Sequence, residues 1–346
     1  MAYTTRPNDV SIKDIAKAVG VSHSTVSRAL ADSPLVASET KQRIQRVARE
    51  MGYTPSAIAR GLVTKRTATI GLVVTTIADP FIAEVVQGVE ETALDYGYNV
   101  ILCDCNAEPA RELACVRTLR EKRVDGIVVT SSRVGSLYMP LLEELGVPIV
   151  LINNQHEGRY VYSVRTDNLT GGRLAGEYLL SLGHRHIAYI AGPFGAHSSV
   201  ERLEGCRAAL QEHGLDIPDH WVAPGDGRTN GGHAGVDFLL QRSPRPTAIF
   251  CYNDMTAIGA LQAIKEAGLQ VPGDFSLIGY DDIAFAAFVD PPLTTVAQAK
   301  YTLGQRAMDM TLNLLNGQGE ADDILLAPRL VERASCAPAS LYGSRG

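Results

Sequence analysis

Residues 10–30, VSIKDIAKAVGVSHSTVSRAL, hold two short apolar runs at helical spacing with a glycine between them. The first run is Ile12, Ile15, Ala16 and Val19, and the second is Val26, Ala29 and Leu30. Gly20 tolerates the positive φ that a tight turn requires, and Ser22 is a residue type that opens a helix. The stretch therefore predicts a helix-turn-helix.

The outward face of the second predicted helix is polar. It carries His23, Ser24, Thr25, Ser27 and Arg28. Such side chains can donate and accept hydrogen bonds at base edges and phosphates in a DNA major groove. The alternative is an ordinary helical hairpin with a solvated face, because a glycine turn is common in helical proteins.

Charge is distributed unevenly along the 346 residues. The whole chain carries a net charge of -6, yet residues 1–66 contain eleven Lys and Arg against five Asp and Glu. The remainder holds 21 basic and 33 acidic residues. A basic head on an acidic body is the charge pattern expected when a DNA-contacting module is joined to a regulatory module.

Nothing in the composition favours secretion, a membrane or a metal. The first ten residues lack the apolar core of a signal peptide, and no run of about 18 apolar residues occurs. The six cysteines form no CxxC pair and stand near no histidine at ligand spacing. We expect a cytoplasmic protein with reduced cysteines, no metal and no cofactor.

A third helix and a short segment complete the head. Ser38 is the expected N-cap of a helix whose apolar stripe includes Ile44 and Val47, and Gly52 is expected to end it. Residues 54–62, TPSAIARGL, start a helix at Pro55 but are too few to be stable alone. This segment is expected to be helical only when something packs against it.

From Thr69 onward, apolar strands alternate with amphipathic helices. Strands are predicted at 70–75, 98–103, 126–130, 149–152, 163–165, 187–191, 248–251 and 276–279. Helices are predicted at 82–95, 109–122, 170–182, 200–213, 232–241 and 255–267. This alternation predicts an α/β body of two doubly wound parallel lobes, with ligands binding beyond the carboxyl ends of the strands.

With head, short helix and body in place, the chain resembles the lactose repressor (LacI/GalR) family of bacterial transcriptional regulators from residue 10 to about residue 335. The stretches that carry the resemblance include SIKDIAKAVGVSHSTVSRAL, the SETKQRIQRVAREMGYTPSAIARGL run, KRVDGIVV, LGHRHIAYIAGP, RPTAIFCYNDMTAIGAL, LIGYDD and PPLTTVAQ.

The resemblance implies DNA-binding roles for seven residues. His23, Ser24 and Arg28 match positions that select the operator sequence, and Thr25 and Ser27 match positions that contact phosphates. Leu62 matches a leucine that paired hinge helices insert into the minor groove, and Ala59 packs beside its symmetry mate. Gly61, where many relatives have serine, raises the cost of forming that hinge helix by roughly 0.5 to 1 kcal/mol relative to alanine.

The body, like those of the family, resembles periplasmic sugar-binding proteins. The positions that match ligand contacts are Asp79, Phe81, Ser131, Asn153, Arg202, Asn253, Asp281 and Gln298. Carboxylates, amides and a guanidinium suit paired sugar hydroxyls, and Phe81 is suited to stack on a ring face. Local structure is the alternative for each, since Asp281 and Asn253 are suited to cap helices and Asp79 precedes a proline.

Three local features qualify the resemblance. Asn153-Asn154 replaces the Asp-Arg of pentose-binding relatives, which puts a pentose in doubt, and Gly227-Arg228 lies where some relatives place an aromatic lid. Residues 198–201, SSVE, read as a capping box.

Two other function classes fit the sequence less well. An enzyme is not expected because Walker A, GxSxG, HExxH and GxGxxG motifs are missing. His184 and His186 are interpreted as surface or capping groups rather than general bases. A secreted sugar receptor is the stronger alternative for the body, but it needs a signal peptide and has no use for a basic head.

The predicted organisation has four parts. Residues 1–54 form the helix-turn-helix head, 55–66 the hinge helix and linker, 67–336 the effector-binding and dimerisation domain, and 337–346 a C-terminal tail. The N-lobe is expected to span about 67–167 and 297–327, and the C-lobe about 168–296 and 328–336. The expected protein is a homodimeric repressor that binds a pseudo-palindromic operator under control of a sugar-like or polyol effector.

Overall fold

The computed structural model describes residues 10–53, 66–132, 134, 146–154, 162–318 and 322–339. The chain divides into two compact units, Met1–Thr67 and Ala68–Gly346. We call them the head and the body and describe each by itself.

The described residues of the head form three helices around a small apolar core. They are α1 (Ile12–Val19), α2 (His23–Leu30) and α3 (Ser38–Glu50). Ile15, Val26 and Ile44, one from each helix, are fully buried. Gly20 adopts φ 75°, and the hydroxyl of Ser22 accepts the Thr25 backbone N–H at 3.1 Å. The predicted helix-turn-helix is confirmed.

The start of α3 corrects one prediction. Ser38 is the first residue of the helix rather than its cap, and Ala37 occupies the N-cap position without a side-chain bond. The carbonyl of Ala37 already accepts the N–H of Lys41 at 2.9 Å, so the helical ladder begins one residue earlier than the Ser38 signal indicates.

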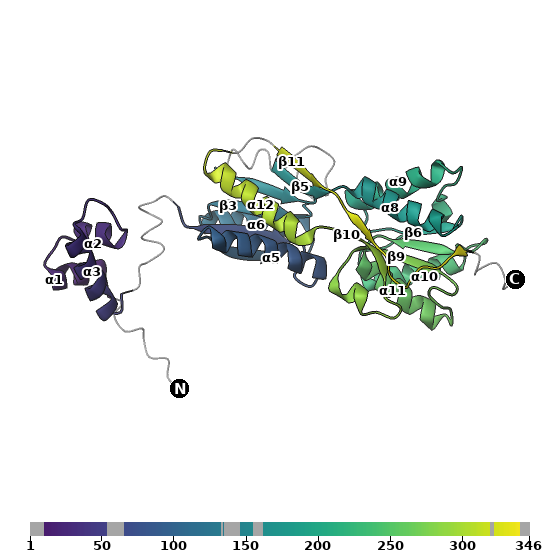
Figure 1. Ribbon diagram of the computed structural model, residues 1–346, viewed down its shortest axis with the longest axis horizontal. Coiled ribbons are helices and arrows are strands. Elements are labelled where there is room, and N and C mark those ends of the chain that lie inside the picture. Colours follow the sequence, from purple (N-terminus) through teal and green to yellow (C-terminus); the bar gives the residue numbers. More distant parts are fainter. Residues whose placement is uncertain are drawn as a thin grey trace, which may run out of the picture. The chain divides into compact units, whose positions relative to one another are not determined.

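The body contains two six-stranded sheets (Figure 1). The first has the order β11-β5-β4-β3-β1-β2 and the second β12-β10-β9-β8-β6-β7. Their bounds are β1 Thr69–Val74, β2 Asn99–Asp104, β3 Gly126–Thr130, β4 Ile149–Ile152, β5 Tyr162–Thr166, β6 Ile187–Ile190, β7 Val222–Ala223, β8 Ala248–Cys251, β9 Ser276–Asp281, β10 Thr294–Ala297, β11 Asp322–Leu326 and β12 Arg329–Val331. Neighbouring strands are parallel except β10 and β12. The predicted doubly wound body is confirmed, with one antiparallel edge.

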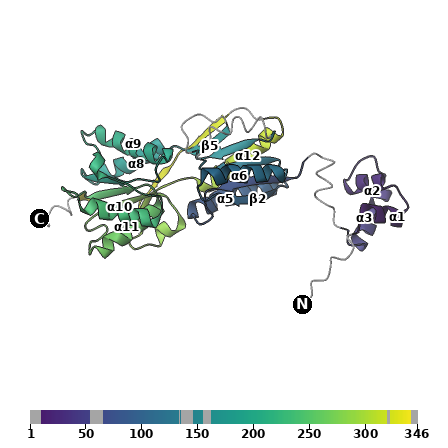
Figure 2. The same cartoon turned by 180° about the vertical axis from the view of Figure 1, so that it is seen from behind.

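Helices cover both faces of each sheet. They are α5 Pro80–Asp95, α6 Pro109–Glu121, α8 Asn168–Ser181, α9 His197–Gln211, α10 Thr229–Leu240, α11 Asp254–Glu266 and α12 Lys300–Leu315, with short 3-10 turns at Asp219–Trp221 and Ala284–Ala287. On the first sheet, α5 and α12 pack on one face and α6 packs on the other. Alternate strand residues point to opposite faces, so each face presents its own apolar cluster to the helices that cover it. On the second sheet, α8 and α9 lie on one side and α10 and α11 on the other (Figures 1 and 2).

The sequence pattern did not reveal β7, β10, β11, β12 or α12. β7 has two residues, and β11 begins with two aspartates, so neither shows an apolar run. These late elements nevertheless define the two lobes. The chain leaves the first sheet after β5, returns to it through α12 after β10, and crosses again between β11 and β12.

Glycines at the contact between α8 and α9 serve helix packing. A Cβ at Gly172 would collide with the backbone carbonyl of Arg202 on α9, and a Cβ at Gly205 would collide with that of Leu169. Absence of side chains at these points lets the two helix backbones approach closely. The cavity described below therefore has a tightly packed wall.

His184 differs from its prediction as a surface group. It is fully buried, and its ring nitrogens bond the hydroxyls of Thr247 and Ser276 at 2.9 Å each. Burial lowers its pKa, so the ring is a neutral structural link inside the second lobe. His186 is exposed, and all six cysteines are free thiols.

Candidate functional site

The polar face of α2 is available in the head. His23, Ser24 and Arg28 are exposed, and Thr25 and Ser27 are partly exposed. The Thr25 hydroxyl lies 2.8 Å from the Ser22 hydroxyl, so it also takes part in the helix cap. Ala59 and Leu62 lie outside the described residues, and their hinge roles stay predictions.

The eight predicted effector residues all line one cavity of about 700 Å³ in the body. They come from both lobes: Asp79, Phe81, Ser131 and Asn153 follow strands of the first sheet, and Arg202, Asn253 and Asp281 belong to the second lobe, with Gln298 at a crossing. This is the size and position of small-molecule sites in open α/β sheets. The structure brings the eight together; their role in binding stays a proposal.

The first-lobe wall is the N-terminus of α5. One Asp79 carboxylate oxygen accepts the N–H of Phe81 at 3.0 Å, so Asp79 is the N-cap of α5, a local role beyond the turn before Pro80 that the sequence offered as the alternative. Burial raises the pKa of Asp79, and the Phe81 bond and the positive charge of Arg228 oppose that rise. Phe81 is 7% exposed and belongs to the apolar core. Asp79 retains an oxygen for a ligand, whereas Phe81 offers only the small part of its surface that faces the cavity.

A chain of side-chain hydrogen bonds links the two lobes along the cavity floor. The Asn153 amide donates to the Gln298 oxygen at 3.3 Å, and the Gln298 nitrogen donates to Asp281 Oδ1 at 2.6 Å. The Thr166 hydroxyl donates to the same Gln298 oxygen at 2.6 Å, and the Thr166 N–H donates to Asn153 Oδ1 at 2.8 Å. Gln298 therefore connects the end of β4 to the end of β9.

Asp281 is the most unusual of these groups. It is 5% exposed, ends β9 and has φ 112°. Within the described part of the chain its Oδ2 has no hydrogen-bond donor. Burial holds the pKa of Asp281 well above its usual range, against the attraction of the Arg202 guanidinium. A buried carboxyl with one free oxygen facing a cavity is an acceptor left for a ligand.

Arg202 supplies a fixed positive charge near Asp281. The side chain is 4% exposed, donates Nε–H to Asn168 at 3.0 Å and an Nη1–H to the carbonyl of Tyr252 at 2.6 Å. Its guanidinium carbon lies 3.7 Å from the centre of the Tyr280 ring. These two bonds use only part of the N–H groups of a guanidinium, so donors remain for a ligand in a fixed orientation.

Asn253 has a structural role that the sequence left open. Its Oδ1 caps α11 through the N–H of Thr256 at 2.9 Å, and its Nδ2 donates to the carbonyl of Gly227 at 3.0 Å. The Asn253 amide therefore fixes the cavity wall formed by α11 and Gly227. A ligand that contacts Asn253 bonds an amide that already has these two partners.

The predicted capping box at residues 198–201 is wrong. Helix α9 already begins at His197, so Ser198 and Ser199 lie in its first turn. Ser199 instead accepts the Gly192 N–H at 2.9 Å, and Ser198 lines the cavity 3.2 Å from the Tyr252 hydroxyl.

Several cavity residues escaped the sequence argument. They include Thr76, Asn106, Pro193, Ser198, Asp226 and Tyr252, while Arg228, noted before only at the place of a lid, lines the cavity as well. Asn106 follows β2 and Tyr252 follows β8, so the strand-end rule that selected Asn253 carried the signal for both. No motif indicated Pro193 or Asp226.

The described residues offer neither a metal site nor a membrane span. No group of three or more His, Cys, Asp or Glu is placed to hold a metal, and no helix has the length and apolarity needed to cross a membrane.

Comparison with known proteins agrees with this architecture. Residues 11–56 match the bacterial regulatory proteins of the lacI family, and residues 67–334 match the periplasmic binding proteins and sugar binding domain of the LacI family. The chain is 37% identical over 330 residues to the HTH-type transcriptional repressor PurR of Proteus mirabilis (strain HI4320), covering 94% of this chain and 97% of that protein.

Two solved structures are also similar. The lac repressor dimer bound to operator and the anti-inducer ONPF superposes with a TM-score of 0.87 at 28% identity, covering 95% of this chain and all of that one. A LacI family transcriptional regulator from Enterococcus faecium with bound ribose has a TM-score of 0.71 at 30% identity, over 78% and 99% of the two chains. The two family matches and the identity to a repressor over nearly the whole chain show that this chain is a transcriptional regulator that belongs to the LacI family of bacterial regulatory proteins.

Proposed function

We propose that the protein represses transcription as a homodimer on a pseudo-palindromic operator, under control of a small polyhydroxylated effector in the body cavity. The observation that carries the proposal is the meeting of all eight predicted effector positions on one cavity of about 700 Å³. The exposed polar face of α2 supports the DNA-reading half, with His23, Ser24 and Arg28 facing bases and Thr25 and Ser27 facing phosphates. The hinge contacts of Ala59 and Leu62 remain part of this proposal.

A neutral polyol fits the polar groups of the cavity. Asp281 offers an acceptor, Arg202 offers donors, and Ser131 and Asp79 add groups of both kinds on the opposite wall. Acceptor and donor groups face the cavity together, so a ligand with many hydroxyls can satisfy both without carrying a net charge. A sugar or sugar alcohol therefore fits better than a simple anion or cation.

Exposed apolar side chains support the homodimer. Leu94 and Tyr96 at the end of α5 are 63% and 64% exposed, and Ile101 and Leu102 lie on the edge strand β2. Phe285 and Phe288 form a second exposed pair, and Phe288 is 82% exposed. Clusters of this kind mark surfaces that are covered by a partner. A lac repressor relative is a dimer on its operator, which fits the same arrangement here.

The coupling between ligand and operator follows from linkage. The effector and the operator influence each other if each binds one arrangement of the two lobes more tightly than the other arrangement. The free energy of operator binding then changes on effector binding, typically by about 1 to 3 kcal/mol. A role as a sugar receptor without DNA is the competing proposal, and the basic head with its exposed reading face argues against it. Because bacterial operators lie in the cytoplasm, the proposal includes that location for the protein.

The test of the effector half is a thermal-shift screen of the full-length protein over D-ribose, cellobiose, other sugars, polyols, nucleosides and sugar phosphates. At a ligand concentration 100 times Kd, stabilisation is about 2.7 kcal/mol, which gives a clear rise in Tm. Arg202→Ala is expected to abolish the shift, and Arg173→Ala, an exposed arginine on α8, to retain it. A shift that survives Arg202→Ala would contradict the cavity assignment.

A further inference from the structure

Lys300 is a buried lysine at a crossing between the lobes. It is the first residue of α12, the helix that returns the chain to the first sheet after β10, and it is 5% exposed. Lysine is among the residues least often buried, and a buried ammonium must be fully bonded. Its partners therefore indicate what it does.

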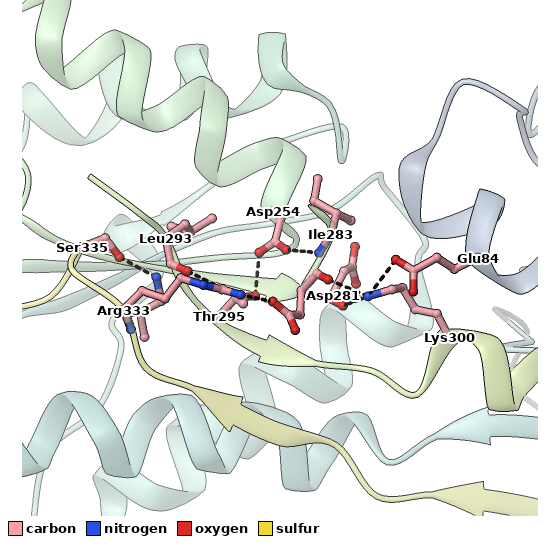
Figure 3. Close-up of polar contacts among 11 residues, drawn as sticks. Glu84, Asp254, Asp281, Ile283, Leu293, Thr295, Lys300, Arg333 and Ser335 are labelled. Carbon is pink, nitrogen blue, oxygen red and sulfur yellow. Dashed lines mark hydrogen bonds and ion pairs between the residues drawn. The ribbon is translucent and has the colours of Figure 1, made fainter. Parts of the chain in front are cut away.

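Two of these partners are carbonyls of the turn that carries Asp281 (Figure 3). The Lys300 ammonium donates to the carbonyl of Asp281 at 2.8 Å and to that of Asp282 at 2.6 Å. Both aspartates have positive φ, 112° and 56°, a conformation that side chains other than glycine adopt only when their surroundings hold them. Lys300 is one of the groups that hold this turn.

The turn is fixed from the second lobe as well. The N–H of Ile283 donates to Asp254 at 2.9 Å, and Arg333 donates to the Asp282 carboxylate at 2.6 Å, as Figure 3 shows. The Asp254 and Arg333 contacts lie within the second lobe. Lys300 approaches the same turn from the other side, at the start of a helix that packs on the first lobe.

The third partner of Lys300 lies on α5, the helix whose N-terminus lines the opposite side of the cavity. Its ammonium lies 3.3 Å from Glu84 Oε1 on α5. The same helix begins with Asp79 as its cap and Phe81 in its first turn, which are the first-lobe residues of the cavity. The three hydrogens of one ammonium are thus directed at groups attached to both walls.

We propose that Lys300 is a positioning residue for the effector cavity, fixing the turn that presents the Asp281 carboxylate and tying that turn to the α5 wall. It touches no cavity ligand itself. The inference rests on the proposed function for its meaning, since only an effector makes the relative placement of Asp281 and α5 matter. One ammonium group then couples the turn that orients Asp281 to the position of α5.

Hydrogen–deuterium exchange of the full-length protein, with no small molecule added, tests this. Lys300→Met is expected to raise exchange at least tenfold at residues 281–283 and 298–300 and several-fold at residues 79–85. Exchange in the central strands β3 and β8 is expected to stay unchanged, which separates a local role from general destabilisation. Lys300→Arg keeps the cation and its donors and is expected to restore most of the protection.

Two further variants separate the two walls. Glu84→Gln is expected to raise exchange at 79–85 and leave 281–283 protected, because the carbonyl bonds remain. Lys265→Met is the matched control, since Lys265 also bonds a carbonyl and faces a carboxylate, both of Asp290, but on the exposed surface. It is expected to leave all of these segments unchanged.

Two results would overturn the proposal: wild-type exchange at 281–283 in Lys300→Met, or an equal rise in β3 and β8. If Lys300→Met does not fold, unchanged exchange at 79–85 in Glu84→Gln would overturn it instead. A failed sugar screen with the wild-type protein would contradict the proposed function and leave these exchange results standing, so the two failures are distinguishable.

Discussion

Replacing Asp281 with asparagine separates binding from stability more sharply than any other change in the cavity. Asparagine keeps the oxygen that accepts the Gln298 N–H and replaces the free Oδ2 by an NH2 group. A ligand hydroxyl that donates to this oxygen loses its acceptor and meets an NH2 donor instead, which costs about 1.5 to 3 kcal/mol. The effector Kd is therefore expected to rise roughly 10- to 150-fold.

The same substitution is expected to weaken effector binding but to raise the free energy of unfolding relative to the wild type as pH rises. Burial raises the pKa of Asp281 well above its usual range, so the folded protein holds this proton more tightly than the unfolded chain does. The contribution of Asp281 to stability consequently falls as pH rises from about 4, the unfolded pKa, up to its folded pKa, by about 1.4 kcal/mol per pH unit in that interval. The asparagine side chain does not titrate, so the Asp281→Asn variant is expected to gain on the wild type as pH rises.

The assay is urea denaturation at several values between pH 4 and pH 8, followed by tryptophan fluorescence. Trp221 is the single tryptophan of the chain and is buried in the second lobe, so it reports on the lobe that contains Asp281. Asp95→Asn, at the exposed end of α5, is the control for the same change of carboxylate to amide outside the cavity. Effector affinity is measured on the same samples by calorimetry.

Two results would refute this reasoning. One is a variant that is less stable than the wild type at pH 7 by more than about 1 kcal/mol, because that would make the carboxylate a net stabilising group. The other is an unchanged effector Kd, which would remove Asp281 from the binding site.

Three other predictions concern packing, DNA reading and assembly. Gly172→Ala forces α8 from α9 and is expected to lower the free energy of unfolding by about 1 to 3 kcal/mol in urea titrations, while the surface change Arg173→Ala costs less than about 1; equal effects would refute the close-packing account. Arg28→Ala is expected to relax operator sequence preference by about 1 to 3 kcal/mol at one base pair in competition binding assays, and an unaltered preference would exclude it from base reading. Phe288→Glu is expected to shift the protein toward monomer in sedimentation velocity, and a dimer of unchanged affinity would place the interface elsewhere.

The sequence carried most of the fold because its signals were local and redundant. Gly20 and Ser22 each specify one backbone feature of the head, and both appear where the pattern places them. The central strands are apolar runs between amphipathic helices, which is the strongest available signal for a parallel sheet. The edge strands β7, β11 and β12 lack that signal, because short or charged edge strands need little apolar sequence.

The sequence predicts which residues of the candidate site line the cavity, but not what each side chain does there. The rule that ligands bind beyond strand ends brought Asp281 and Asn253 to the same cavity. No local sequence pattern shows that the Asn253 amide is hydrogen-bonded to Thr256 and Gly227, whereas Asp281 has an oxygen without a donor among the described residues. Lys300 was missed for the same reason, since its partners lie 18 or more residues away and meet only through the fold.

The most direct test of the central claim is a fluorescence anisotropy titration of the full-length protein with DNA from the promoter beside its own coding sequence. It is done with and without the sugar that gives the largest thermal shift. The account predicts salt-dependent binding of a dimer that discriminates against scrambled DNA, with an operator Kd that the sugar changes about 5- to 150-fold. Equal affinity for scrambled DNA, or an operator Kd that the bound sugar leaves unchanged, would contradict it.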